Sequence, residues 1–251
     1  MTVVITGAAT GIGAAMARAF ADAGYRVAVT DVDVDAATRT ASAIDGAMAL
    51  GLDVRDRGSI EAACRDAIRE MGPLDIWVSS AGVSTMGRFV ELSDEEIDLN
   101  LDVNIRGALI SGQVAARQFM EQDQGGCIIN VASMAGKRGA VPYLAHYVAS
   151  KFAVVGLTQA MACELAPFNI RVNSVCPGYV QTGMQEREIG WEAQLKGVTA
   201  NEVVEFYVAD TPLRRLQTAS EVAAVALFLA SDAAKSITGE SVAINGGSYM
   251  D

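Results

Sequence analysis

Short apolar segments rich in β-branched residues alternate with amphipathic helical patterns along the whole chain. The segments expected to form strands are 3–5, 26–30, 47–52, 75–78, 127–131, 170–175 and 241–244. The helical patterns that separate them cover 11–24, 35–44, 59–71, 94–121, 147–166 and 220–231. Strands that are apolar on both faces and separated by helices are typical of a parallel sheet covered on both sides. Right-handed crossovers then predict a doubly wound α/β fold, with a seven-stranded parallel sheet between helix layers.

The length and the continuity of this pattern predict one Rossmann-type domain over residues 1–251, without a repeat or a linker. One stretch, 181–215, is too long for an ordinary loop between a strand and a helix. We expect it to form a partly helical substrate lid, because it contains several large apolar residues: Met184, Trp191, Leu195, Phe206 and Tyr207. Residues 181–215 are called the lid below. The alternative is a surface insertion that packs on its own aromatic side chains.

The charge balance excludes several classes of partner. The chain carries 30 Asp and Glu against 19 Lys and Arg, which gives a formal net charge of −11. Nucleic acids are bound through Lys and Arg contacts to phosphates, so we expect no nucleic-acid partner. An anionic membrane surface is disfavoured as well, and no uncharged run reaches the ~18 residues that a membrane span requires. The single histidine, His146, excludes a His-rich metal site, and we expect no metal.

The four cysteines favour a reducing compartment. Cys64, Cys127, Cys163 and Cys176 are far apart in sequence, and no CxxC pair occurs. Each lies in an apolar run, where a reduced cysteine acts as a small buried hydrophobe. The first apolar run already belongs to a glycine-rich motif, so we expect no signal peptide. Together these features predict a cytoplasmic protein.

A glycine-rich loop follows the first expected strand, with the sequence Thr-Gly-Ala-Ala-Thr-Gly-Ile-Gly at 6–13. Gly7 allows a sharp turn, Gly11 allows close approach of a pyrophosphate, and Gly13 allows the helix to pack close to the sheet. The N-terminus of the next helix then presents free N–H groups and a positive dipole end to the phosphates. A strand before the loop and an amphipathic helix after it make this a dinucleotide-binding pattern. The cofactor-binding residues expected here are Gly7, Thr10, Gly11, Ile12 and Gly13.

Asp31 predicts which dinucleotide is bound. It ends the second expected strand, where a carboxylate can accept hydrogen bonds from the adenosine ribose hydroxyls and would repel a 2′-phosphate. No Arg or Lys lies between Arg26 and Arg39 to bind such a phosphate. We therefore expect NAD rather than NADP. Asp53 and Val54, after the third expected strand, are placed to reach the adenine, although a plain turn aspartate is an alternative for Asp53.

Tyr147 and Lys151 form the candidate catalytic pair. At i and i+4 they lie on one face of a helix, and Ser133 closes the preceding strand at the ligand end of a parallel sheet. A nearby ammonium favours a phenolate, so Lys151 should lower the pKa of Tyr147. The alternative is a surface pair on an amphipathic helix. Tyr143 lacks a lysine at i+4 and is expected only to line the pocket, and His146 to be a rim or packing residue.

These motifs together resemble the short-chain dehydrogenase/reductase family over essentially the whole chain. The resemblance rests on the glycine-rich loop at 6–13, Asn104, Ser133 ahead of Tyr147-Val148-Ala149-Ser150-Lys151, the segment Asn173–Gly178, and Gly246-Gly247. It implies that Tyr147 exchanges a proton with the alcohol or ketone, while Ser133 hydrogen-bonds its oxygen. It also implies that Lys151 holds the nicotinamide ribose, and that Asn104 kinks its helix and holds a water linked to Lys151. By the same resemblance, the remaining cofactor contacts are Ala81, Gly82, Pro177, Gly178, Val180 and Thr182.

The chain departs from the family pattern in two places. Ser79-Ser80-Ala81-Gly82 stands where the family usually has Asn-Asn-Ala-Gly, so hydrogen bonding at the sheet centre should be weaker or water-mediated. The interval between Ser133 and Tyr147 is one residue longer than in many members. We place the extra residue near Val141-Pro142, at the border of the pocket.

The substrate is the least determined feature. The stretch 144–147 and the lid segment 182–188 look most like members that oxidise sugar alcohols or vicinal diols, and polar lid residues (Gln185, Glu186, Glu192) could bind hydroxyls. The leading expectation is therefore an NAD-dependent oxidoreductase that interconverts a polyol or vicinal diol and its ketone. The alternatives are a 3-oxoacyl thioester reductase, which an acidic chain with Asp31 fits poorly, and a non-catalytic NAD-binding interaction protein. The resemblance also implies a homotetramer or homodimer.

Overall fold

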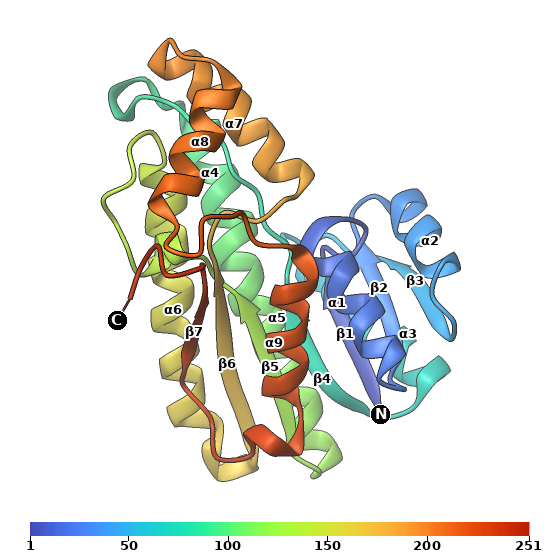
Figure 1. The fold of residues 1–251 in the computed structure, drawn as a ribbon. Helices are drawn as coiled ribbons and strands as arrows, with labels where there is room; N and C mark the ends of the chain where they lie inside the picture. The colour runs from blue at the N-terminus through green and yellow to red at the C-terminus, as the bar shows by residue number, and fades with distance from the viewer. Residues whose placement is uncertain (251) are drawn as a thin grey trace.

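A computed structural model describes residues 1–250 of the chain. The fold is a seven-stranded parallel sheet in the order β3-β2-β1-β4-β5-β6-β7, with helices on both faces (Figure 1). The chain order reverses between β1 and β4, which is where doubly wound sheets form their ligand crevice. The predicted fold class is confirmed.

The strands lie close to the expected segments. They are β1 (Thr2–Thr6), β2 (Arg26–Asp31), β3 (Ala47–Gly51), β4 (Leu74–Ser79), β5 (Gly126–Val131), β6 (Ile170–Pro177) and β7 (Ser241–Ile244). The helices are α1 (Gly11–Asp22), α2 (Val34–Ser42), α3 (Arg57–Met71), α4 (Asp94–Leu101), α5 (Gly107–Gln122), α6 (Ala145–Leu165), α7 (Gly183–Lys196), α8 (Ala200–Asp210) and α9 (Ala219–Ala230).

The alternation of side chains along the central strands builds one core on each face of the sheet. Val3 and Ile5 of β1 pack with α1, α2 and α9, whereas Val4 lies on the opposite face with α3, α5 and α6. Trp77 and Phe119 are almost completely buried in the second core. Both faces of β1 are thus removed from water, which explains why its central residues, Val3 to Ile5, are all apolar rather than alternating.

The segment predicted as one helix over 94–121 is two helices joined by a π-helical turn, Asp102–Arg106. Asn104, inside this turn, is buried and turns its amide toward a neighbouring loop. Its Oδ1 accepts from the Val83 N–H at 2.8 Å, and its Nδ2 donates to the Val83 carbonyl at 2.9 Å. This pairing explains the interruption, because the helix widens where the Asn104 side chain serves backbone groups outside it. The helix is therefore irregular at Asn104, in the form of this π-helical turn.

The lid contains α7 and α8, which stand beyond the sheet at the end where α4 begins (Figure 1). The two helices pack on each other around Ala193, Val203 and Tyr207. Tyr207 also stacks on Tyr179, with ring centroids 4.0 Å apart. The lid is thus largely helical, and its small core includes the Tyr179 ring that follows β6.

Three features of the fold bear on the expected compartment, membrane contact and metal binding: the cysteines, one long apolar helix and the grouping of possible metal ligands. Cys64, Cys127 and Cys176 are buried. Burial raises the pKa of the Cys64 and Cys127 thiols to about 11. Cys163, contrary to expectation, is exposed on α6. One helical segment, Ala145–Phe168, is long and apolar enough to cross a membrane by length and composition alone. That segment packs on β6 in this fold. Within residues 1–250, no three His, Cys, Asp or Glu side chains gather in a way that could hold a metal ion.

Candidate active site

A cavity of about 780 Å³ opens at the carboxyl ends of the strands, between the glycine-rich loop and the lid. The predicted site residues that line it are Gly7, Thr10, Gly11, Ile12, Gly13, Asp31, Asp53, Val54, Ala81, Gly82, Ser133, Tyr147, Lys151, Pro177, Gly178, Val180 and Thr182. Asn104 is the one predicted residue outside the lining. It lies just behind the wall, where a Cβ atom built on Gly82 would come within 3.4 Å of its Oδ1.

The glycine-rich loop is shaped by close contacts that only glycine permits. Gly7 adopts a φ of +64°, and a Cβ atom there would press on the backbone of Ala81. A Cβ atom on Gly13 would overlap the carbonyl oxygen of Gly7. Thr10 precedes α1 without a side-chain cap, so the first-turn N–H groups of the helix remain available to an anionic ligand. The loop therefore fits the pyrophosphate of a dinucleotide.

Asp31 lies beside this loop at the end of β2. Its Oδ2 accepts from the Ala9 N–H at 3.2 Å, and its Oδ1 accepts from the Asp33 N–H at 3.1 Å. Asp53 forms a two-point ion pair with Arg55, with Arg55 Nη2 2.7 Å from Asp53 Oδ2, and this pairing lowers the pKa of the Asp53 carboxyl. Arg55 lines the same cavity, but its guanidinium is already engaged by Asp53.

The serines that replace the family's asparagines receive direct support from β1. The Thr6 hydroxyl accepts from the N–H groups of Ser80 and Ala81, each at 3.1 Å. This hydroxyl supports the backbone of the loop without help from the Ser79 or Ser80 side chains. The Ser79 hydroxyl is buried and has no hydrogen-bond partner within residues 1–250. The weaker hydrogen bonding expected at this point therefore concerns the serine side chains and not the backbone of the loop.

Tyr147 and Lys151 project from α6 into the cavity, next to Ser133 at the end of β5. The Lys151 ammonium lies 5.5 Å from the centroid of the Tyr147 ring and donates to the Val131 carbonyl at 3.0 Å. Asn104 reaches the same helix, because its Nδ2 donates to the Ser150 hydroxyl at 3.1 Å. One face of α6 thus carries the phenol and the ammonium, and the π-helical turn contacts α6 through the hydrogen bond between Asn104 and Ser150.

Burial controls the ionisation of both groups in this structure. Burial lowers the pKa of Lys151 from 10.5 to about 8, because the charged ammonium has lost contact with water. Burial also raises the pKa of Tyr147, and the Glu188 carboxylate raises it further, while a hydrogen bond with Ser133 lowers it. The predicted lowering of the Tyr147 pKa by Lys151 is thus absent here. Desolvation of the phenol is the largest influence on its pKa and outweighs the lowering by the hydrogen bond with Ser133.

The two other candidates in this stretch have structural roles. Tyr143 is not part of the cavity lining, contrary to expectation, although its neighbours Val141, Pro142 and Leu144 are. Its backbone has a φ of +66°, and its carbonyl accepts from the Gly87 N–H at 3.0 Å. His146 is buried, and its Nε2 lies 2.6 Å from the Thr85 hydroxyl. It is a packing histidine, as expected, and it does not line the cavity.

One face of α7 adds polar groups to the cavity, and they differ in part from the polar lid residues expected from the sequence. Gln185, Glu188 and Glu192 line the cavity, whereas Glu186 is exposed outside it and cannot bind a substrate hydroxyl there. Glu188 was not singled out from the sequence. The signal that could have found it is the helical spacing i, i+3, i+7 of these three residues, which places them on one face.

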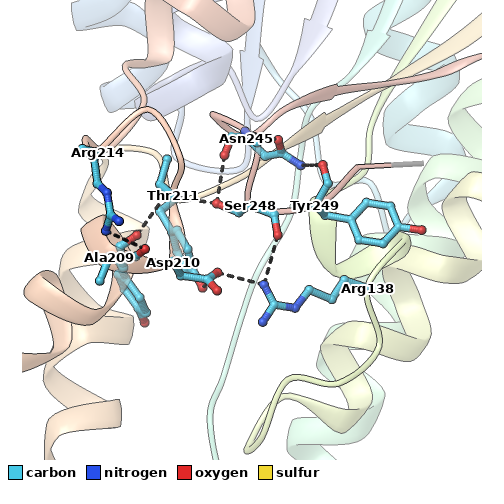
Figure 2. Close-up of polar contacts among 11 residues, drawn as sticks. Arg138, Ala209, Asp210, Thr211, Arg214, Asn245, Ser248 and Tyr249 are labelled. Atoms are coloured by element: carbon cyan, nitrogen blue, oxygen red, sulfur yellow. Dashed lines mark hydrogen bonds and ion pairs between the residues drawn. The ribbon is translucent and has the colours of Figure 1, made fainter.

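The lid is fastened to the loop before α6 and to the C-terminal segment. Arg138 Nη1 lies 2.8 Å from Asp210 Oδ2 and donates to the Ser248 carbonyl at 3.3 Å (Figure 2). Tyr179 also donates its hydroxyl proton to Asp210 Oδ2, at 3.1 Å. The Thr211 and Ser248 hydroxyls are 3.0 Å apart. Asp210, the last residue of α8, thus joins three segments that border the cavity.

Known proteins resemble this chain in sequence over almost its whole length. A family model described as enoyl-(acyl carrier protein) reductase matches residues 7–249. The chain is 42% identical to a protein named as the ketoacyl reductase of the monensin polyketide synthase from Streptomyces virginiae, covering 97% of this chain and 95% of that one. It is 34% identical to a sorbitol dehydrogenase from Cereibacter sphaeroides, covering 99% and 97%.

Solved structures show the same fold. A short-chain type dehydrogenase/reductase from Mycobacterium marinum has a TM-score of 0.91 at 36% identity, over 100% of this chain and 96% of that one. This chain is a short-chain dehydrogenase/reductase. A variant of actinorhodin polyketide ketoreductase with NADPH is also similar, with a TM-score of 0.93 at 32% identity over 98% and 96% of the chains. The predicted family is confirmed, and this dehydrogenase/reductase accordingly uses a nicotinamide cofactor.

Proposed function

We propose that this dehydrogenase/reductase uses NAD to interconvert a secondary alcohol, in a polyol or vicinal diol, and the corresponding ketone. The observation that carries the proposal is that one cavity is lined both by the glycine-rich loop and by Tyr147, Lys151 and Ser133. When bound, the nicotinamide accepts a hydride from the carbinol carbon or returns it to the ketone. The chain supplies the proton transfer, the positioning of the substrate and the exclusion of water.

Tyr147 takes the hydroxyl proton of the alcohol in oxidation and returns it in reduction. A phenol is a weak base near neutral pH, so the reaction needs the charge of Lys151 near the phenolate as it forms. The Ser133 hydroxyl, which interacts with Tyr147, is placed to hydrogen-bond the reacting oxygen and stabilise its developing charge. Asn104 is a positioning residue that fixes α6 through Ser150.

The preference for NAD rests on Asp31. Its carboxylate lies beside the glycine-rich loop, where it can accept from the two ribose hydroxyls and would repel a 2′-phosphate. Arg55, a cavity-lining cation on the loop after β3, is held by Asp53. Asp53 and Val54 are assigned to the adenine, and Pro177, Gly178, Val180 and Thr182 to the carboxamide end of the cofactor.

The polyol or diol assignment is supported by the polar face of α7 and by the likeness to a sorbitol dehydrogenase. A second candidate is reduction of a 3-oxoacyl thioester, which the likeness to two ketoreductases favours. The net charge of −11 and the carboxylates of the cavity oppose an acidic carrier protein. A non-catalytic NAD-binding protein is a third candidate, and any NAD-linked turnover excludes it.

A screen by NADH absorbance tests the proposal. Polyols, vicinal diols, hydroxyketones and hydroxyacyl thioesters are each supplied with the matching oxidised or reduced NAD or NADP. Reduction of NAD⁺ with polyols or diols is expected at a higher kcat/KM than any reaction of a thioester. A higher kcat/KM for thioester reduction with NADPH contradicts the proposal and favours the second candidate.

We further propose that the protein is cytoplasmic and forms a homotetramer or homodimer. The buried thiols of Cys64, Cys127 and Cys176 suit a reducing compartment. The exposed apolar side chains Leu109 on α5 and Phe152 on α6 are 45% and 43% exposed, and a second copy could cover them. Light scattering after size-exclusion chromatography checks the assembly, and a monomer at micromolar concentration contradicts it.

A further inference from the structure

Glu188 stands on the cavity-facing side of α7, opposite the catalytic pair. Its carboxylate is partly buried and acts electrostatically on both members of the pair, raising the pKa of Tyr147 and that of Lys151. Burial in turn raises the pKa of Glu188 itself, and its neighbour Glu192 raises it further. The carboxylate lines the same cavity as Tyr147 and Lys151, while it belongs to the lid rather than to the sheet.

The hydrogen bonds of the three polar residues on this face differ in a way that leaves Glu188 open. Glu192 is occupied, because it accepts from the Tyr207 hydroxyl and forms an ion pair with Lys196. Glu188 accepts from Gln185 Nε2 at 3.2 Å and interacts with the Ser84 side chain. No Lys or Arg within residues 1–250 forms a salt bridge with Glu188. A carboxylate has about four acceptor positions, so Glu188 keeps acceptor capacity directed at the cavity.

We infer that Glu188 is the residue that selects the substrate, by accepting a hydrogen bond from a second hydroxyl group of the alcohol. This inference rests on the proposed function. An acceptor without a bound cation binds a hydroxyl or an ammonium, but Lys151 and Arg187 already line the cavity, act on Glu188 and repel a further cation. An anionic group would be repelled at this point by Glu188 itself, since its carboxylate forms no salt bridge within residues 1–250. A neutral alcohol with more than one hydroxyl is the chemistry that fits.

The inference can be tested because Glu188 should affect the oxidation of a diol and of a simple alcohol differently. A second hydroxyl gains a charge-assisted hydrogen bond from Glu188, so a diol benefits from the carboxylate. A simple alcohol has no such group and meets only the unfavourable influence of Glu188 on the Tyr147 base. Removing the charge should therefore slow oxidation of a diol while leaving oxidation of a simple alcohol unchanged or faster.

The experiment compares butane-2,3-diol with butan-2-ol, at saturating NAD⁺, in the wild type, Glu188→Gln, Glu188→Ala and Glu186→Gln. Glu186 lies two residues away on α7, exposed and outside the cavity, so Glu186→Gln is the matched control. Binding of NADH, followed by fluorescence, shows that each variant is folded. In Glu188→Gln and Glu188→Ala, kcat/KM for the diol should fall about 10- to 100-fold, mainly through KM. The value for butan-2-ol should stay within about threefold or rise, and Glu186→Gln should match the wild type.

The outcomes separate the inference from the function on which it rests. Oxidation of the diol with an unchanged ratio of diol to butan-2-ol in both Glu188 variants overturns the inference and leaves the proposed function standing. An equal loss for both alcohols also overturns it, because Glu188 would then support the fold or the cofactor site. Oxidation of neither alcohol by the wild type contradicts the proposed function, and the inference falls with it.

Discussion

The Lys151 ammonium lies 5.5 Å from the centre of the Tyr147 ring, one helical turn along α6, and is only 4% exposed. Both groups therefore lose most of their hydration in the same place. Burial disfavours the charged form of each group, so the Tyr147 phenol stays protonated near neutral pH, while the Lys151 ammonium loses its proton only near pH 8. Lys151, with a pKa of about 8, is the member of the pair that titrates near physiological pH.

The lowered pKa of Lys151 predicts a pH dependence of stability. Its folded pKa of about 8 lies below the unfolded value of 10.5, so the unfolded chain binds more protons between these two values. The contribution of Lys151 to the free energy of unfolding therefore rises with pH in this window, by about 2 kcal/mol between about pH 8 and about pH 9.5. Lys151→Met lacks this contribution. Denaturant unfolding of both proteins at one protein concentration should show a wild type that gains stability relative to the variant as pH rises. A constant difference between them contradicts the assignment.

Asp31 is predicted to set the cofactor preference. Asp31→Ser removes the carboxylate that would accept from the ribose hydroxyls, and charge-assisted hydrogen bonds of this kind correspond to about 10- to 100-fold in affinity. The kcat/KM for NAD should fall by that factor, and the preference over NADP should shrink because the repulsion of a 2′-phosphate is gone. Asp45→Ser, on an exposed turn, serves as the control. A wild type that favours NADP would refute this prediction.

Two glycine substitutions should have opposite effects. In Gly13→Ala the new Cβ atom would overlap the Gly7 carbonyl, so we expect a loss of about 1–3 kcal/mol in stability and weak NADH binding. In Gly190→Ala, within α7, a Cβ atom meets nothing within 4 Å. That substitution should stabilise the protein by about 0.5–1 kcal/mol, because alanine has the higher helix propensity. Thermal unfolding and NADH titration check both, and similar behaviour of the two variants would be inconsistent with the close packing at Gly13.

Asp210→Asn should loosen the lid. The variant loses the ion pair between Asp210 and Arg138. Because the side chains of Arg138 and Asp210 are 32% and 20% exposed, the loss should lower global stability by at most about 1 kcal/mol. Limited proteolysis within the lid should become several-fold faster, and the KM for substrate should rise more than kcat falls. Glu205→Gln, exposed on the same helix α8, is the control. Equal proteolysis of the two variants would show that Asp210 does not fasten the lid.

The fold could be predicted because its signals are local. Strands such as β1 and β4 are apolar on both faces, and the glycine-rich loop marks the point where the first strand meets α1. Tyr147, Lys151 and Ser133 were found for a similar reason, because the first two share a helix face and the third ends a strand. These relations depend on helical and strand geometry, which the spacing of residues along the chain reveals.

The remainder depends on partners that are distant in sequence. The π-helical turn at Asn104 exists because that side chain pairs with Val83, which lies 21 residues away. His146 is a packing residue because its partner Thr85 lies 61 residues away. Glu188 lines the cavity because the packing of α7 on α8 fixes which face of α7 is turned toward the cavity. The raised pKa of Tyr147 likewise reflects the burial of the folded site, which residue spacing does not report.

The central claim is that Tyr147 carries the proton in an NAD-linked oxidation, and a single assay tests it most directly. NADH absorbance is followed for the wild type and Tyr147→Phe with NAD⁺ and a vicinal diol, while NADH binding is measured for both by fluorescence. General acid–base catalysis of this kind contributes about 10²- to 10⁴-fold, so kcat should fall by at least 100-fold with NADH affinity unchanged. Substantial residual turnover by Tyr147→Phe, with intact NADH binding, would contradict the account.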